Sequence, residues 1–477
     1  MPATGPAARR PPARHSGPMA APPQSERGKL ITSVLQEAFA PLMRGNPAAF
    51  RQKFRKMARD PHAFYRGSAC LFFADVTGQA DPYADEQSSR IWIHADLHVE
   101  NFGTYLNSDG RLVFDVNDFD EAYIGRFTWD LQRFAASLAL IAWQKAIPEA
   151  QVRRLIGRYA RAHLAQVDAY RETDDDANDF ALNLDNTDGA IKGALLTART
   201  RRRADLLDQL TELDIKRGRR RFREDATVRR LGARERRAVR EAFEAYLSTI
   251  PDNKRFDRAL FYELRDLVGK SGFGIGSAGL PAYNVLVEGY SQALDNDVVL
   301  SMKQANIPAV SRFVDASTIE GYFAHEGHRT VVSQHALQAH TDPLLGHASI
   351  DGVGYVVAEV SPYEIDLDWD SLHEPDDIAQ VVEQLGRATA KIHCASDEDN
   401  DEDLVDFQVE DAIAASVHRR RREFVSWLTD WALEYAAQVR ADHAEFVEEF
   451  RSGADRGGGD LGSAAPSGPA DAAGARA

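Results

Sequence analysis

Two short apolar segments separated by a turn form the clearest local pattern in the chain. Phe102–Leu106 and Leu112–Val116 are each largely apolar, and the sequence NSDG between them is a strong turn signal. The pattern therefore predicts a β-hairpin. Asn101 precedes its first strand, and Asp118 and Asp120 follow its second strand. Because antiparallel pairing brings the entry and exit of a hairpin together, we expect His94, Asp96, Asn101 and Asp118 to converge at one end of a small sheet.

Longer stretches show helical and strand periodicity in a mixed order. In WDLQRFAASLALIAWQKA, apolar residues recur at Leu131, Phe134, Leu138 and Ile141, which predicts a helix with one buried face. Strands are predicted at YNVLVEGY, VVLSMKQA and VGYVVAEVSP, and helices at TIEGYFAHEGHRTVVSQHALQA and DDIAQVVEQLGRATAKIHCAS. The order of these elements predicts an α+β fold.

Composition and charge exclude some classes of protein. The 477 residues are 44% hydrophobic and 27% charged, as in globular proteins, and no apolar run reaches the length of about 20 residues that a membrane span needs. The first 28 residues and those from 452 onward are rich in Pro, Ala and Gly, and we expect them to be disordered. Two cysteines offer neither a disulfide framework nor zinc spacing, so a cytoplasmic location is expected.

The net charge of −16 makes nucleic-acid binding an unfavoured function. A basic stretch at 199–240 interrupts this acidity. Leucines and alanines recur among its arginines, which favours solvated helix faces; a surface for an acidic substrate or phosphate is the alternative.

The polar residues around the predicted hairpin have the spacing of a phosphotransferase loop. His94 and Asp96 are followed by four residues and then Asn101, as in the kinase pattern H-R-D-x-x-x-x-N, and Asp118 begins a DFD sequence where D-F-G would stand. Oxygen ligands of this kind suit Mg²⁺. Taken singly, each motif could instead be a polar turn or a helix cap. A third alternative is a zinc hydrolase that uses His94, Asp96 and His98, although no further ligand stands at a fitting spacing.

Several motifs resemble known families. HADLHVEN, NDFDEA and WDLQRFAASL are similar to the aminoglycoside and choline phosphotransferase branch of the protein-kinase-like fold. The closer resemblance is to domain of unknown function 2252 (DUF2252), over residues 50–395. It is carried by HAFYRGSA, HADLHVENFG, FDVNDFDEA, WDLQRFAASLAL, GFGIGSAG and LQAHTDPLLG.

The resemblance implies roles for individual residues. Asp96 would be the catalytic base in a loop that His94 opens, and Asn101, Asp118 and Asp120 would hold the metal ion. Asp130 would support the loop from the following helix. At position 95 an alanine replaces the more usual glycine, a small-for-small change. Two further residues have no settled role: Arg66 binds an anion or forms a structural ion pair, and His393 is expected to be a core or capping residue.

A candidate nucleotide-binding segment follows later in the chain. Gly274, Gly276, Ser277 and Gly279 belong to GFGIGSAG, and Lys303 lies on a predicted strand downstream. Glycines allow close approach of the backbone to phosphates, and a strand-borne lysine can pair with them, so ATP is the expected cofactor. The acid that would partner Lys303 is left open among Glu320, Glu326 and, as a substitute, Gln334.

The motif order predicts a two-lobed protein-kinase-like fold that is circularly permuted, with the catalytic loop before the nucleotide lobe. We expect a helical lobe at 29–255 with a helical insert at 150–255, a β-rich lobe at 256–372, and helices returning to the first lobe at 373–451. The expected activity is ATP- and Mg²⁺-dependent phosphoryl transfer to a hydroxyl of an unknown small molecule or protein, with substrate contacts in the insert. The alternatives are AMP transfer, a catalytically silent nucleotide-binding protein and a metal-dependent hydrolase.

Overall fold

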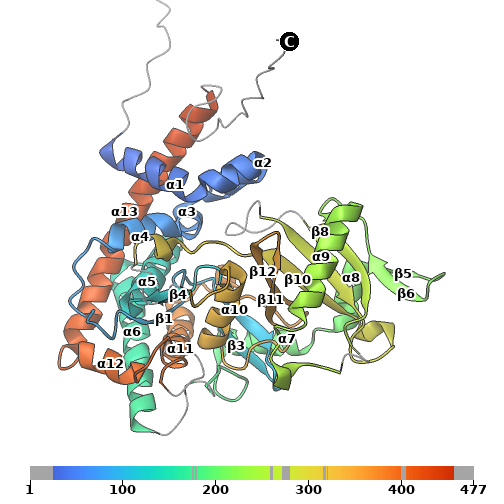
Figure 1. Ribbon diagram of the computed structural model, residues 1–477. Coiled ribbons are helices and arrows are strands. Elements are labelled where there is room, and N and C mark those ends of the chain that lie inside the picture. Colours follow the sequence, from blue (N-terminus) through green and yellow to red (C-terminus); the bar gives the residue numbers. More distant parts are fainter. Residues whose placement is uncertain are drawn as a thin grey trace, which may run out of the picture.

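Helices and a six-stranded sheet occupy two sides of the molecule in the computed structural model (Figure 1). The structure describes residues 25–173, 177, 180–257, 261–270, 280–314, 319, 321–398 and 404–455. Its helices and strands confirm the predicted α+β class.

The helical region is built around α5 (Phe127–Gln144), whose neighbours are the long helices α6 (Glu149–Glu172) and α13 (Arg421–Asp455). Nearly all of α5 is buried, including Asp130 and Arg133, whereas its periodicity predicted one buried face. The helix is covered on several sides because the chain returns to it repeatedly. The other helices of this region are α1 (Glu26–Gly45), α2 (Pro47–Met57), α3 (Pro61–Gly67), α4 (Ala69–Val76), α7 (Gly189–Arg199), α11 (Pro375–Cys394) and α12 (Val409–Ser416).

The predicted hairpin is confirmed residue for residue. Strands β2 (Phe102–Leu106) and β3 (Leu112–Val116) pair in antiparallel register, with Gly110 in the left-handed conformation that its turn requires. A second short pair joins β1 (Ile91–Ile93) to β4 (Tyr123–Gly125). The loop at 94–101 therefore connects β1 to β2, and the turn at 117–122 connects β3 to β4.

The sheet region is a six-stranded antiparallel sheet in the order β11-β12-β10-β9-β8-β7. Its two faces pack differently, because successive side chains of a strand point to opposite sides. On one face, Leu300 and Met302 of β10 pack with α9 (Ala233–Tyr246); on the other, Val299 packs with α8 (Arg203–Leu210) and β6 (Arg219–Phe222). The strands are β7 (Val228–Arg229), β8 (Leu264–Lys270), β9 (Ala282–Val287), β10 (Val298–Gln304), β11 (Gly346–Ile350) and β12 (Val353–Glu359), while β5 (Thr211–Asp214) pairs with β6 outside the sheet.

The segment that leads from β12 to α11 joins the two regions by pairing with β2. Thr104 donates its backbone N–H to the carbonyl of Ile365 at 2.9 Å and its hydroxyl to the carbonyl of Tyr363 at 2.6 Å. Gly103 lies beneath this crossing, where an added Cβ would sit 3.1 Å from the Ile365 carbonyl oxygen. The hairpin and the joining segment thus hold each other in place.

Several expected boundaries differ from the structure. Helix α1 begins at Glu26, inside the stretch that we expected to be disordered, and Arg27 is bound by Asp75 and Asp442. The remainder of the first predicted tail lies outside the described residues. Residues 228–246, which the sequence analysis grouped with the first lobe, pack on the sheet as β7 and α9. The stretch 150–255, expected to be helical, also contains β5 and β6.

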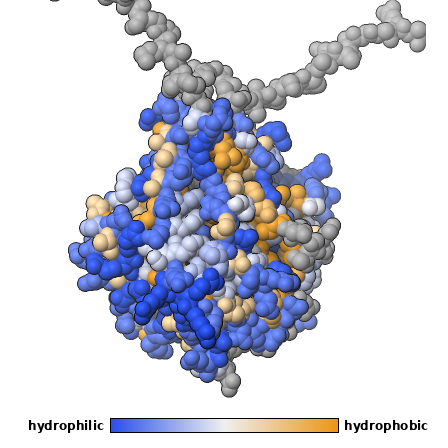
Figure 2. Space-filling model, turned by 90° about the vertical axis from the view of Figure 1, so that its left-hand side faces the viewer, coloured by the Kyte–Doolittle hydropathy of each residue, from blue (hydrophilic) through white to orange (hydrophobic). Residues whose placement is uncertain are grey.

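The surface of the helical side is mainly hydrophilic in the view of Figure 2, where apolar residues gather in a narrower band. Across the described parts of the chain, no helix combines the length and the apolar character needed to cross a bilayer.

Candidate functional site

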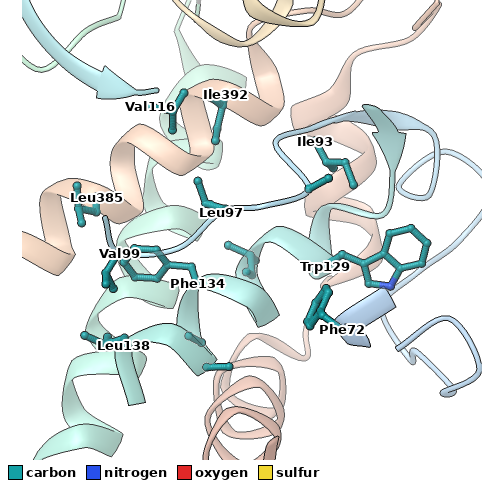
Figure 3. Packing of buried hydrophobic residues seen from close by; sticks show 14 of the residues in the cluster. Phe72, Ile93, Leu97, Val99, Val116, Trp129, Phe134, Leu138, Leu385 and Ile392 are labelled. Carbon is teal, nitrogen blue, oxygen red and sulfur yellow. The ribbon is translucent and has the colours of Figure 1, made fainter. Parts of the chain in front are cut away.

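Apolar side chains anchor the loop at 94–101 in the main core. Leu97 and Val99 are fully buried and lie near Phe134 and Leu138 of α5 and Leu385 of α11 (Figure 3). The alternation of polar and apolar residues in HADLHVEN therefore has a physical meaning, because the apolar residues fix the loop while His94, Asp96 and His98 remain available for polar contacts.

Asp130 supports the loop from α5, as the resemblance implied. Its carboxylate accepts hydrogen bonds from the backbone N–H groups of His94 at 2.7 Å and Ala95 at 2.8 Å. His393, expected to be a core residue, is fully buried and lies 3.3 Å from the same carboxylate. Ala95 has a φ of 60°, which explains why glycine suits that position. The two hydrogen bonds to Asp130 thus hold a loop whose backbone is strained at Ala95.

Asp96 is held by Arg133, a buried residue that the sequence analysis did not assign to the site. The Arg133 guanidinium donates to Asp96 Oδ1 through Nε at 2.7 Å and also through Nη2, while its own position is fixed by the carbonyl and ring of Tyr65. Asp96 Oδ2 lies 3.9 Å from His98 Nε2. Burial raises the pKa of Asp96, and Arg133 opposes that rise. One carboxylate oxygen is thus engaged and the other is available to a ligand.

The hairpin brings Asn101 and Asp118 together with Asp96, as predicted. Asn101 Nδ2 donates to the Asp96 carbonyl at 2.9 Å, and the backbone N–H of Asn117 donates to the Asn101 carbonyl at 3.1 Å. Asp118 is exposed to the cleft and has a φ of 62°, a conformation that non-glycine residues adopt mainly at functional sites and turns.

A buried arginine of α10 (Glu326–Leu337) fixes the turn that carries Asp120. Arg329 donates to the carbonyl of Asp120 at 2.8 Å and to that of Ala122 at 2.7 Å. Burial and the neighbouring Asp118 raise the pKa of Asp120 to about 6. Two carboxylates that repel each other in this way are suited to share a cation.

The donor set fits a magnesium ion better than zinc. Mg²⁺ commonly takes one or two carboxylates and completes its shell with water and substrate phosphates. Asp118 and Asp120 line both cavities and can supply the carboxylates, whereas Asn101 is 3% exposed and lines neither of them. The imidazole of His94 faces away, since its Nε2 lies 2.8 Å from the Asn117 carbonyl oxygen. Nowhere in the described chain do three or more His, Cys, Asp or Glu side chains form a group able to hold a metal ion. The set expected for a zinc hydrolase at His94, Asp96 and His98 is therefore not brought together.

A large cleft opens on the sheet side of Asp118 and Asp120. Its volume is about 1300 Å³ out to the solvent, and it is lined by the hairpin, by α10, by the joining segment and by one face of β10 and β12. Ser301 and Lys303 line it because they alternate with the buried Leu300 and Met302. Lys303 thus faces the same space as Asp118.

The expected acid partner of Lys303 is not found on α10. Glu326 pairs with Arg329, Gln334 lines the cleft, and Glu320 lies outside the described residues. The Lys303 charge instead lowers the otherwise raised pKa values of Asp120 and Glu364. The predicted phosphate-binding residues Gly274, Gly276, Ser277 and Gly279 also lie outside the described residues, but the strands that they connect, β8 and β9, are adjacent and antiparallel.

A second cavity lies on the other side of the same two aspartates. Its empty space is about 630 Å³ when the open solvent at its mouth is included. It is lined by Asp96, Asp118 and Asp120 together with residues of α1 to α4 and of the segment after β10. Among the described residues of 150–255, none lines either cavity. The expectation of substrate contacts in that insert is therefore not supported.

The sequence analysis did not assign the buried Arg133 and Arg329 to the site. One feature of the sequence could have indicated Arg133. In the helix WDLQRFAASL, Asp130 and Arg133 stand three positions apart, and charged residues this close on a largely apolar helix indicate a buried polar partner. Arg329 also stands three positions after an acidic residue, Glu326, but that spacing gives no sign of its bonds to the carbonyls of Asp120 and Ala122, about 200 residues earlier in the chain.

The family comparison agrees with the motifs that surround this site. Residues 44–449 match the family described as "Uncharacterized protein conserved in bacteria (DUF2252)". The chain belongs to the DUF2252 family. No curated protein and no solved structure matches the chain. For this DUF2252 protein, the chemistry must therefore be argued from the geometry of the site.

A pH-dependent contribution to stability is expected from Glu121, which lines the second cavity. Its carboxylate accepts hydrogen bonds from the Ala309 N–H and the Asn306 amide, and burial raises its pKa to about 7. Because this pKa is above the unfolded value, the contribution is full below about pH 4.5 and is lost as pH rises through 7.

We therefore expect wild type to lose about 1–2 kcal/mol more stability than Glu121→Gln between pH 5 and pH 8 in metal-free buffer. Thermal unfolding of both proteins across that range measures the difference. Parallel curves would contradict the prediction.

Proposed function

We propose that this protein is an ATP- and Mg²⁺-dependent phosphotransferase whose acceptor is a hydroxyl group. The observation that supports it most is the placement of Asp118 and Asp120 between two cavities, with Lys303 in the first and Asp96 in the second. Phosphoryl transfer needs a bound nucleotide phosphate, a metal ion and a base on the acceptor side, arranged around one point. Lys303 on the nucleotide side, the two aspartates in the middle and Asp96 on the acceptor side follow this arrangement.

The order of elements in the sheet region also supports a nucleotide site. The glycine-rich segment connects two antiparallel strands, β8 and β9, the lysine lies on the next strand, β10, and a helix, α10, follows. Protein kinases place their glycine-rich loop, strand lysine and following helix in the same succession. In this chain the loop with Asp96 precedes these elements, so the proposal includes a circularly permuted, kinase-like arrangement of two lobes.

The proposed reaction assigns a separate task to each residue. Lys303 pairs with the nucleotide phosphates, and Asn101, Asp118 and Asp120 would hold Mg²⁺, which neutralises charge on the transferring group. Asp96 Oδ2 accepts the proton of the acceptor hydroxyl while Arg133 keeps Oδ1 in place. The acceptor oxygen bonds to the γ-phosphorus, the bond to the bridging oxygen breaks, and ADP leaves with the electron pair.

Thermal unfolding with ATP, with and without Mg²⁺, tests the proposal. A ligand at 100 times its dissociation constant adds roughly 2.7 kcal/mol, or a shift of about 2–4 °C for a domain of this kind. We expect a Mg²⁺-dependent shift in wild type and none in Asp118→Asn. Asparagine tolerates the left-handed backbone at 118, so the substitution removes charge without new strain.

Two outcomes of this measurement would count against the proposal. Wild type that shows no shift would contradict nucleotide binding and favour a silent scaffold or a hydrolase. A shift of equal size in Asp118→Asn would place the nucleotide elsewhere. If nucleotide binds, a label at the γ- or the α-phosphate of ATP separates phosphoryl transfer from AMP transfer by the group that reaches the acceptor.

A further inference from the structure

The second cavity contains a buried lysine without a polar partner. Lys53 of α2 is 4% exposed and lines the cavity together with Asp96. In the described chain its ammonium group makes no hydrogen bond or ion pair, and it lies 4.0 Å from the centroid of the Phe39 ring. A buried cation that no carboxylate contacts is costly, and an anion bound in the cavity would supply that contact.

The carboxylates that line the cavity already have other partners. Asp96 is bound by Arg133, and Glu121 accepts hydrogen bonds from Ala309 and Asn306. Asp118 and Asp120 are assigned to the metal ion. None of the four forms an ion pair with Lys53, although the charges of Asp96 and Glu121 raise the pKa of Lys53 against the lowering effect of burial.

A second cation of the cavity is also unpaired. Arg312 follows β10 in the 3-10 helix Ala309–Arg312, and its guanidinium donates to the Ala38 carbonyl at 3.2 Å. Within the described residues it forms no ion pair. Arg66, by contrast, is paired with Glu100 and contacts His98, so it adds little free charge. Lys53 and Arg312 are thus cations of the cavity that, among the described residues, no carboxylate contacts, although four carboxylates line the same cavity.

We propose that this cavity binds the acceptor and that the acceptor carries an anionic group, a phosphate or a carboxylate, beside its hydroxyl. Lys53 and Arg312 bind the anionic group, and the hydroxyl lies at Asp96. The inference rests on the proposed function, because it takes the nucleotide to occupy the cleft that contains Lys303. In this proposal the substrate contacts come from the N-terminal helices. They do not come from the insert at 150–255, where the sequence analysis placed them.

Calorimetric titration of anions into the nucleotide-loaded protein tests the inference. Inorganic phosphate and acetate serve as the two probes, at pH 7, with the cleft filled by Mg²⁺ and a non-hydrolysable ATP analogue. We expect one of them to bind at a single site in wild type and to bind about tenfold or more weakly in Lys53→Met, since a charge-assisted hydrogen bond is lost. The probe that binds tells whether the acceptor group is a phosphate or a carboxylate.

Matched variants separate this inference from the proposed function. Lys56→Met lies on the same helix, does not line the cavity and should leave anion binding unchanged. Arg312→Gln changes an exposed residue and should weaken anion binding even if Lys53→Met proves unstable. Lys303→Met should weaken nucleotide binding and retain anion binding when nucleotide is absent.

The outcomes that overturn the inference differ from those that overturn the proposed function. Nucleotide binding without any binding of either anion at tens of millimolar would overturn the inference alone. Anion binding that is equal in wild type, Lys53→Met and Arg312→Gln would do the same, because the anion would then bind elsewhere. Failure of wild type to bind the nucleotide would overturn the phosphotransferase proposal, and with it the acceptor role of the cavity.

Discussion

Asp96→Asn is expected to slow phosphoryl transfer by about 10²- to 10⁴-fold, the usual contribution of a positioned general base. The substitution exchanges one carboxylate oxygen for an amide nitrogen. The oxygen that Arg133 binds can be retained, whereas the oxygen that would accept the hydroxyl proton is lost. Transfer of the labelled γ-phosphoryl group of ATP to water is the measurement, because it needs no identified acceptor.

Nucleotide binding distinguishes a lost base from a damaged site. The Mg²⁺-dependent thermal shift with ATP should remain in Asp96→Asn, since Asp118, Asp120 and Lys303 are unchanged. Asp411→Asn on α12 is a suitable control, because Asp411 pairs with Arg171 at the surface and lines neither cavity. Equal rates in wild type and Asp96→Asn would rule out Asp96 as the base.

Lys391→Met is expected to lower the free energy of unfolding by about 3–5 kcal/mol. Lys391 of α11 and Asp115 of β3 form an ion pair in which each side chain is 1% exposed, and the ammonium group also donates to the Leu337 carbonyl at 2.6 Å. Burial lowers the pKa of Lys391 and raises that of Asp115, so each charge depends on the other. Without the lysine, the Asp115 carboxylate is left buried and uncompensated. The shift of the urea unfolding midpoint measures the loss.

The double variant Lys391→Met with Asp115→Leu provides the control for this prediction. It removes both charges and fills the space with apolar groups, so it should recover most of the stability that the single variant loses. A single variant as stable as wild type would show that the pair contributes nothing. A double variant as unstable as the single one would show that the loss comes from packing rather than from the unpaired charge.

Local patterns in the sequence were sufficient for the elements that the chain forms between near neighbours. The hairpin of β2 and β3 follows from two apolar runs and the turn NSDG, and its residues agree with the prediction. The approach of Asn101 to the turn that carries Asp118 follows from that hairpin, because both of its ends lie on the same side. Asp96 joins them through the Asn101 side chain, which donates to the Asp96 carbonyl. The support of the loop by Asp130 followed from the family resemblance.

These local patterns do not predict contacts between segments that are distant in the sequence. The hold of Arg133 on Asp96 depends on α5 passing behind the loop, and the hold of Arg329 on the 117–122 turn depends on α10 lying beside it. The covering of α5 on several sides arises in the same way, since α13 returns about 300 residues later. Periodicity describes one element at a time and carries no information on its partners.

The sequence by itself determined the α+β class, the hairpin and the identity of the polar residues gathered at its ends, because spacing and turn chemistry act over a few residues. Only the tertiary structure decided that Lys303 and Lys53 line cavities on opposite sides of Asp118 and Asp120. These two lysines are separated by 250 positions in the chain. Their placement depends on how the N-terminal helices and the sheet pack against the loop, and packing of that kind leaves no periodic trace in the sequence.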